Sequence, residues 1–264
     1  MKAGRIALCL ASCMAAVSLM AQRPLLLRHD LAAQSWMELN SNIRIKKVMG
    51  DIGTLSLGEF KAGLRSAPHH HTYEQVNIGL FGEFTLPVGG VRHAVSALRG
   101  VVIPADVEHN NDVPNSQTPT LIEFQSTRRV DFPPERETVA LPVGPQALPV
   151  PAGHHVAADF AATSTGWETT AQGVRTKASV GSVSAVGVWV VPVGVRQAFE
   201  LRRHLPGSEQ FAYLVEGAAE ASAGTERASM TPGTVVVGVP GGAPLRATAH
   251  GDRQTLLLVF EATR

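Results

Sequence analysis

Short runs of β-type residues, each followed by glycine or proline, succeed one another along this chain. In the first half the runs occupy residues 43–48, 54–60, 75–86, 100–103 and 120–125. Short strands at regular spacing, with turn residues between them, are typical of an all-β sandwich or barrel. Helical periodicity is present only over residues 30–39, so we expect a helix there and an all-β fold elsewhere.

A proline-rich passage divides the chain. Six prolines fall within nineteen residues: Pro133, Pro134, Pro142, Pro145, Pro149 and Pro151. Proline fixes φ and lacks an amide donor, so a central strand cannot run through this passage. We therefore predict a first domain at residues 40–132, a linker at 133–155 and a second domain at 156–264. The second domain has its own β-type runs at residues 182–192, 210–216, 234–239 and 255–260.

The two halves resemble each other. Residues 69–82 align with residues 204–217 at an offset of 135, and the alignment pairs like residues. The pairs are His69 with His204, Glu74 with Glu209, Gln75 with Gln210, and Gly82 with Gly217. The valine-rich turn that ends at Pro104 recurs at Pro240. Ordered matches at one offset indicate an internal duplication.

The N-terminus has the pattern of a targeting segment. Lys2 and Arg5 precede an apolar stretch over residues 6–20, and the chain turns polar after Ala21. This is typical of a secretory signal peptide, here residues 1–21, and the stretch is too short to span a bilayer. We expect export to the periplasm or secretion, and no membrane span.

The two cysteines, Cys9 and Cys13, both lie in this segment. Residues 10–13 also resemble a lipoprotein cleavage box, although the apolar stretch before Cys13 is short and strongly apolar residues follow it. Lipidation is therefore the less favoured alternative. A chain cut after Ala21 would have neither a disulfide nor a thiol nucleophile.

The charge is close to neutral, at +1 for the full chain, and charged residues make up 17%. A near-neutral chain without a basic stripe gives no electrostatic reason to expect nucleic acid as a partner. We expect a small-molecule substrate.

Three consecutive histidines, His69, His70 and His71, are the strongest chemical signal. In a strand, side chains alternate between faces, so His69, His71 and Gln75 share one face. A site that holds His69 and His71 thus takes Gln75 rather than Glu74, unless a bulge intervenes. The opposite face offers His70 with Glu74, but it continues into apolar residues and indicates packing, so we favour the first set.

His109 follows the Pro104 turn and would add a fourth ligand from a later strand. Neutral imidazole is the commonest protein ligand for borderline transition metals. We therefore predict one divalent ion (Fe, Mn, Ni, Zn or Cu) held by His69, His71, Gln75 and His109. The alternative is a solvated histidine loop with adventitious metal affinity.

Three further residues are candidates for the cavity around such a metal. Strand parity places Tyr73 and Asn77 on the same side as Gln75, and Asn111 lies two residues after His109. Tyr73 is a candidate catalytic base, and Asn77 and Asn111 are candidates for binding substrate. Core or turn roles are the alternative for all three.

These motifs resemble the cupin superfamily. Its first motif, His-x-His, an acid or amide, then Gly, is similar to His69, His71, Gln75 and Gly82, and its Pro-x-Gly-x-x-His motif is similar to residues 104–109. Gln75 stands where many members have Glu, and Asp106 stands where Gly is usual, which suggests a different turn. With the repeat, the whole chain resembles a bicupin, which implies two double-stranded β-helix (jelly-roll) barrels in tandem.

The second half departs from these motifs. Pro206 replaces the second histidine, and the fourth-ligand position falls near Leu245, which leaves only His204 and Gln210. We therefore predict a degenerate cupin without a metal, which stabilises the chain or forms a homodimer.

Four neutral ligands would leave the full charge on the ion, which favours Lewis-acid chemistry over redox cycling. Cupins with three His and one Gln include sugar ring-opening proteins, isomerases and polyketide cyclases. The resemblance thus implies a redox-neutral isomerase, lyase or cyclase that acts on a small, oxygen-rich substrate, such as a sugar-derived compound. The alternatives are a quercetinase-like dioxygenase and a non-catalytic periplasmic binding protein.

Overall fold

The computed structural model describes residues 24–127, 139–140 and 156–264. All regular elements in these residues are strands, which confirms the all-β class. The helix predicted over residues 30–39 is wrong: a turn follows β1 (Leu26–Asp30), and β2 (Met37–Asn40) comes after it. Asp30 Oδ1 accepts the Ala33 amide in that turn, and such local bonding competes with a helix.

Two predictions fall largely outside these ranges. The segment 1–21 is not described, and of the linker at 133–155 only β11 (Val139–Ala140) is described. In the part of the chain that the structure covers, no helix has the length and apolar character needed to cross a membrane.

The first large sheet carries Gln75 of the predicted metal site. Its seven strands run in the order β12-β9-β6-β10-β4-β3-β2. Besides β2 they are β3 (Ile43–Met49), β4 (Thr54–Phe60), β6 (Gln75–Phe81), β9 (Arg99–Ile103), β10 (Thr120–Gln125) and β12 (Val156–Asp159). Two small sheets, β7-β8 and β11-β5, accompany it; these are β7 (Phe84–Val88), β8 (Val91–Val95) and β5 (His69–His70) with β11.

The second large sheet has the order β1-β20-β17-β22-β15-β14-β13. Besides β1 its strands are β13 (Glu168–Thr169), β14 (Arg175–Val180), β15 (Ser184–Val191), β17 (Glu209–Glu216), β20 (Thr234–Gly238) and β22 (Thr255–Ala262). A four-stranded sheet, β16-β21-β18-β19, accompanies it. Its members are β16 (Phe199–Glu200), β18 (Ala218–Ala223), β19 (Glu226–Met230) and β21 (Arg246–His250).

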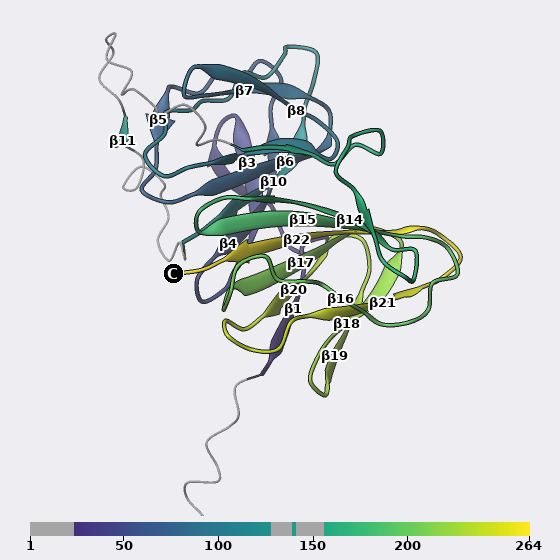
Figure 1. The fold of residues 1–264 in the computed structure, drawn as a ribbon. Coiled ribbons are helices and arrows are strands. Elements are labelled where there is room, and N and C mark those ends of the chain that lie inside the picture. The colour runs from purple at the N-terminus through teal and green to yellow at the C-terminus, as the bar shows by residue number, and fades with distance from the viewer. Residues whose placement is uncertain (1–23, 128–138, 141–155) are drawn as a thin grey trace, which may run out of the picture.

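The strand order supports the internal duplication. The run β9-β6-β10-β4-β3 in one sheet corresponds to β20-β17-β22-β15-β14 in the other. The next strand in each sheet comes from the other half of the chain: β12 pairs with β9, and β1 pairs with β20. Figure 1 shows β1, in purple, among the green and yellow strands. The sheets therefore do not divide where the sequence placed the boundaries, because residues 156–159 lie in the first sheet and residues 26–30 in the second.

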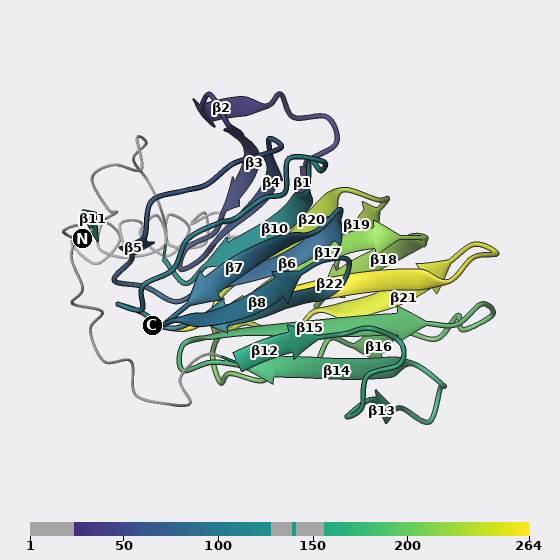
Figure 2. The same cartoon turned by 90° about the horizontal axis from the view of Figure 1, so that it is seen from above.

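The two large sheets pack face to face (Figures 1 and 2). One apolar cluster lies between them and takes Val76, Ile78 and Phe124 from the first sheet and Phe211 and Phe260 from the second. A separate apolar cluster fills each half, on the face of its large sheet that points away from the other half. Both faces of each large sheet are therefore covered, so alternate residues of one strand serve different interiors.

Two buried glutamates, one in each half, bind backbone amides of the opposite half. Glu74 accepts the amides of Ser182, Val183 and Ser184 at 2.8–3.0 Å, and the Ser184 hydroxyl at 2.7 Å. Glu209, its counterpart in the repeat, accepts the amides at positions 51, 52 and 53 at 2.7–3.0 Å. Each carboxylate thus binds the turn that precedes a central strand of the other half. Hydrogen bonds to an ionised acceptor are the stronger kind.

We predict that Glu74→Gln and Glu209→Gln each lower the free energy of unfolding by about 2–4 kcal/mol, because an amide nitrogen cannot accept these buried N–H groups. Urea unfolding would measure the effect. Glu216→Gln is the matched control, since Glu216 is on the same strand as Glu209 but exposed. Losses no larger than that of the control would contradict the role of the two carboxylates.

Candidate metal centre

A backbone bridge places two of the histidines side by side. The His69 amide donates to the His109 carbonyl at 3.0 Å, and the His109 amide donates to the His69 carbonyl at 2.8 Å. This antiparallel pair brings together two motifs that are forty residues apart in the sequence. The bridge is possible because the Pro104 turn folds the second motif back along the first: the Asp106 amide donates to the His71 carbonyl at 2.6 Å.

Gln75 and His71 reach the same place from a broken strand. The expected continuous strand is interrupted, since β5 ends at His70 and β6 begins at Gln75. His71 lies in the break and is buried, and Gln75 is the first residue of β6. The side chains nevertheless lie on the predicted faces. Glu74 points to the other half of the chain, whereas His71 and Gln75 line a cavity.

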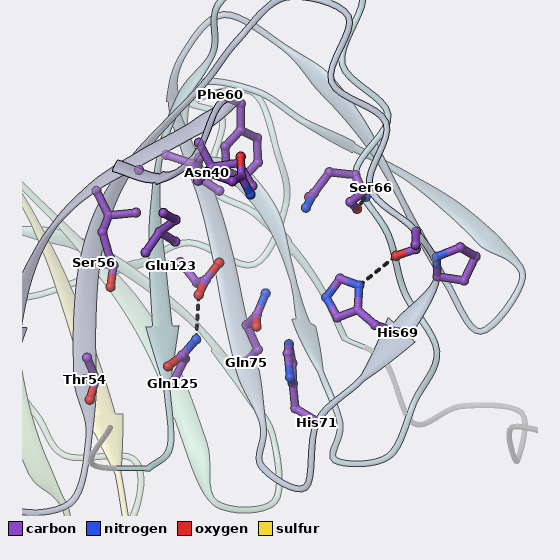
Figure 3. Close-up of a pocket in the computed structure, with 18 residues that line it drawn as sticks. Asn40, Thr54, Ser56, Phe60, Ser66, His69, His71, Gln75, Glu123 and Gln125 are labelled. Carbon is purple, nitrogen blue, oxygen red and sulfur yellow. Dashed lines mark hydrogen bonds between the residues drawn. The ribbon is translucent and has the colours of Figure 1, made fainter. Parts of the chain in front are cut away.

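The three imidazoles could hold a metal ion. One nitrogen from each of His69, His71 and His109 lies within 4.8 Å of the others. The ring centroids are 4.5 Å apart for His69 and His109, and 5.0 Å apart for the other two pairs. Figure 3 shows His69, His71 and Gln75 directed into one space.

Backbone carbonyls orient two of the rings. His69 Nδ1 bonds to the Ala67 carbonyl and His109 Nδ1 bonds to the Val107 carbonyl, both at 2.9 Å. A carbonyl can only accept, so each Nδ1 carries the proton and each Nε2 keeps its lone pair. Such bonds to the outer nitrogen are the usual support of a metal-binding histidine.

Unpartnered atoms provide a test of whether these residues fit a metal. His109 Nε2 and Gln75 Oε1 are both buried, and neither has a hydrogen-bond partner among the described residues. Gln75 is turned this way because its Nε2 donates to Asn77 Oδ1 at 3.3 Å. Buried polar atoms are nearly always paired, so two buried acceptors without partners fit a site for a cation.

The turn at Asp106 differs from the expected one. The sequence suggested a different turn where glycine is usual, but Asp106 has φ +60°, in the left-handed region that glycine favours. Aspartate tolerates this region better than most residues. Asp106 Oδ1 also lies 3.5 Å from His70 Nδ1.

A cavity of about 300 Å³ opens beside the histidines. His69, His71 and Gln75 form part of its wall, and strands β3, β4 and β10 supply most of the rest. Its polar lining residues are Asn40, Thr54, Ser56, Ser66, Asn111, Glu123 and Gln125. This volume is at the small end of the range for ligand pockets.

Glu123 was not predicted from the sequence. It is the one carboxylate among the described residues that line the cavity, and it points inward in Figure 3. Gln125 Nε2 donates to Glu123 Oε1 at 2.6 Å and so fixes the carboxylate. The available signal was alternation in β10, where Glu123 separates the core residues Ile122 and Phe124.

Of the other three predicted site residues, one lines the cavity and two do not. Asn111 lines the cavity, as expected. Asn77 is buried but does not line it, and it orients the amide of Gln75. Tyr73 is also absent from the lining and stacks on His71, with ring centroids 4.7 Å apart and planes 5° from parallel.

In the second half, the equivalent side chains make hydrogen bonds within the protein. Gln210 Nε2 donates to the Leu201 carbonyl at 2.8 Å, and Gln210 Oε1 accepts the Leu245 amide at 3.0 Å. His204 Nδ1 lies 3.1 Å from the buried Glu261 carboxylate. Burial raises the pKa of Glu261, but its hydrogen bonds with His204 and Leu205 outweigh this and bring it below the usual value.

No protein-family model matches this sequence, and no curated protein does. Solved structures do match its fold. AerE from Microcystis aeruginosa is 14% identical, with a TM-score of 0.62 over 87% of this chain and 97% of that one. A variant of oxalate decarboxylase from Bacillus subtilis is 10% identical, with a TM-score of 0.68 over 89% of this chain and 76% of that one.

A putative glyoxylate-induced protein from Pseudomonas aeruginosa is 14% identical, with a TM-score of 0.68 over 91% of this chain and 90% of that one. At such identities the likeness establishes the fold and not the activity. The chain has two large antiparallel sheet systems and shares its fold with bicupins. It also contains a buried cluster of three histidines that could bind a metal of unknown identity.

From the histidine cluster we predict that the metal-free protein loses folding stability in acid. Burial, and to a lesser extent the neighbouring His69, lower the pKa of His109 to about 4, although the Val107 carbonyl opposes this. Between pH 4 and 6.5 the unfolded chain then binds more protons, so stability is complete above about pH 6.5 and falls toward pH 4. The difference corresponds to about 3 kcal/mol.

Urea unfolding of metal-free protein between pH 4.5 and 7.5 would measure this loss. His109→Gln should reduce it, whereas His250→Gln, at an exposed position of β21, should leave it unchanged. An identical pH profile for wild type and His109→Gln would contradict the burial of a neutral imidazole at this position.

Proposed function

We propose that this protein is a metal-dependent enzyme that catalyses a redox-neutral isomerase-, lyase- or cyclase-type reaction on a small oxygen-rich compound. His69, His71, His109 and Gln75 would hold one divalent transition metal. The observation that carries the proposal is the pair of buried acceptors, His109 Nε2 and Gln75 Oε1, without partners in the described structure and beside a cavity.

The neutral ligand set supports the reaction class. When bound, a divalent ion with four uncharged ligands would act as a Lewis acid toward a substrate oxygen. Backbone carbonyls orient the rings of His69 and His109, and burial lowers the pKa of both imidazoles and so favours their neutral form. The structurally similar oxalate decarboxylase removes carboxyl groups from a small oxygen-rich acid, as its name states, so the fold carries lyase chemistry in at least one relative.

Glu123 is the group that we assign to proton transfer, in place of Tyr73. It lies on the cavity wall, and the hydrogen bond that Gln125 Nε2 donates to its Oε1 orients the carboxylate. A positioned carboxylate that moves a proton contributes about 10²–10⁴-fold to a rate. Tyr73 is instead stacked against His71, where it supports the ring.

Metal content tests the ligand set directly. The protein purified with added zinc, nickel, manganese or iron should hold about one ion per chain by elemental analysis, because the four ligands form one site. His71→Ala should lose most of it. His70→Ala is the matched control, since His70 is adjacent in sequence but lies beside Asp106. Metal that is substoichiometric and unchanged by His71→Ala would overturn the proposed function.

Proton transfer tests the reaction class. Metal-loaded protein should catalyse, without oxygen, exchange of α-protons of 2-hydroxy acids, 2-oxo acids or uronates with D₂O, followed by NMR. Glu123→Gln should slow this exchange by about 10²–10⁴-fold and leave metal content unchanged. Glu83→Gln, at an exposed position, is the control. Strict dependence on oxygen would favour the dioxygenase alternative.

A further inference from the structure

The cavity is polar at one end. Strand register places Thr54 of β4, Gln125 of β10 and Gln75 of β6 in one row across the sheet. Two residues further along the strands, the next row on the same face contains Ser56 and Glu123. With the histidines beside Gln75, this end has acceptors and donors for an oxygen-rich group.

The same face becomes apolar along the strands. The third row contains Ile45, Gly58 and Leu121, and the fourth contains Ile43 and Phe60. These residues all line the cavity, and Ile45, Leu121 and Phe60 are at most 6% exposed. Figure 3 shows Phe60 at the end opposite Thr54 and Gln125. Gly58 has no side chain, and the Leu121 side chain packs over it.

Two polar residues, Asn40 and Ser66, are drawn nearer to Phe60 than to Thr54 in Figure 3. The Ser66 hydroxyl accepts the Asn111 amide at 2.7 Å. Asn40 is exposed, and its Oδ1 accepts the Asn42 amide within its own turn. It therefore marks the opening of the cavity to solvent and is not a buried group that demands a polar ligand. The apolar rows lie between this opening and the metal ligands.

We propose, on the basis of the proposed function, that the substrate is a small acid with adjacent oxygens at one end and a single hydrocarbon arm at the other. The head lies beside Gln75 and Glu123, and the arm lies along Ile45, Leu121 and Phe60. At about 3.3 Å per residue, about 13 Å separates the Thr54 row from the Gly58 row, which accommodates a head followed by a ring or a short branched chain.

This substrate class differs from the sugar-derived compound that the family resemblance suggested. Hydroxyl groups along a sugar chain would lie against Ile45 and Leu121, whose side chains cannot replace the bonds of those groups to water. Burying an unpaired hydroxyl is unfavourable, whereas burying a hydrocarbon arm is favourable. The apolar rows therefore select against polyhydroxylated arms.

Binding to three 2-hydroxy acids with the same head tests the proposal. Zinc-loaded protein is titrated by calorimetry with glycolate, 3-phenyllactate and gluconate, which differ only in the arm. We expect 3-phenyllactate to bind at least about tenfold more tightly than glycolate, because its ring is buried. Gluconate should bind no more tightly than glycolate.

Variants locate the arm. Ile45→Thr, and separately the less buried Ile43→Thr, should reduce the advantage of 3-phenyllactate by about threefold to tenfold and leave glycolate affinity unchanged. Val48→Thr is the matched control, since Val48 lies on the same strand but faces the cluster between the sheets. It should leave the preference unchanged, and thermal melts confirm that each variant is folded.

The outcomes separate the two proposals. Equal affinities for glycolate and 3-phenyllactate, tighter binding of gluconate, or no binding of any acid to zinc-loaded protein would overturn the hydrocarbon arm while the metal site stands. Protein that takes up none of zinc, nickel, manganese or iron would overturn the proposed function. The same titrations of metal-free protein then still test the arm, because the apolar rows do not depend on the ion and should preserve the preference for 3-phenyllactate.

Discussion

Face-to-face packing of the two large sheets determines which side of each strand is available for chemistry. Because Val76, Ile78 and Phe124 are committed to the cluster between the sheets, their neighbours Gln75, Asn77 and Glu123 must point into the first barrel. Glu74 and Glu209 strengthen this arrangement from both sides, since each binds backbone amides of the other half. The second half therefore contributes no ligand to the site. It supports the first large sheet, and the opposite face of that sheet carries Gln75 and Glu123.

Much of the fold followed from local pattern. The strands around Gln75, Thr120, Gln210 and Thr255 were predicted near their observed positions, because alternation and turn residues are local signals. The exchange of β1 and β12 between the sheets was not predictable in this way. It depends on pairings such as Leu26 with Gly238, which join residues more than two hundred positions apart. The false helix over residues 30–39 had a local cause, since the periodicity there was outweighed by a turn at Asp30.

The histidines of the candidate site were predicted from the sequence, but the residues of its cavity wall were not. Spacing identifies His69, His71 and His109, because a metal requires several ligands in a fixed pattern, whereas a cavity wall follows only from strand register. Glu123 became visible once β10 was paired with β4 and β6. Asp106 shows the opposite error: a departure from the glycine of the motif suggested a new turn, but aspartate adopts the same left-handed backbone.

The two glutamines show how one repeat can keep its potential for metal binding and the other lose it. Gln75 donates to a neighbouring side chain, Asn77, which leaves its carbonyl oxygen buried and without a partner among the described residues. Gln210 donates to the Leu201 carbonyl and accepts the Leu245 amide, so both ends of its amide are used by the backbone. An amide that is fully paired gains little from a cation, whereas a buried acceptor that lacks a partner gains much. Besides the histidines that the second half lacks, the two halves thus differ in whether the amide leaves a buried acceptor unpaired.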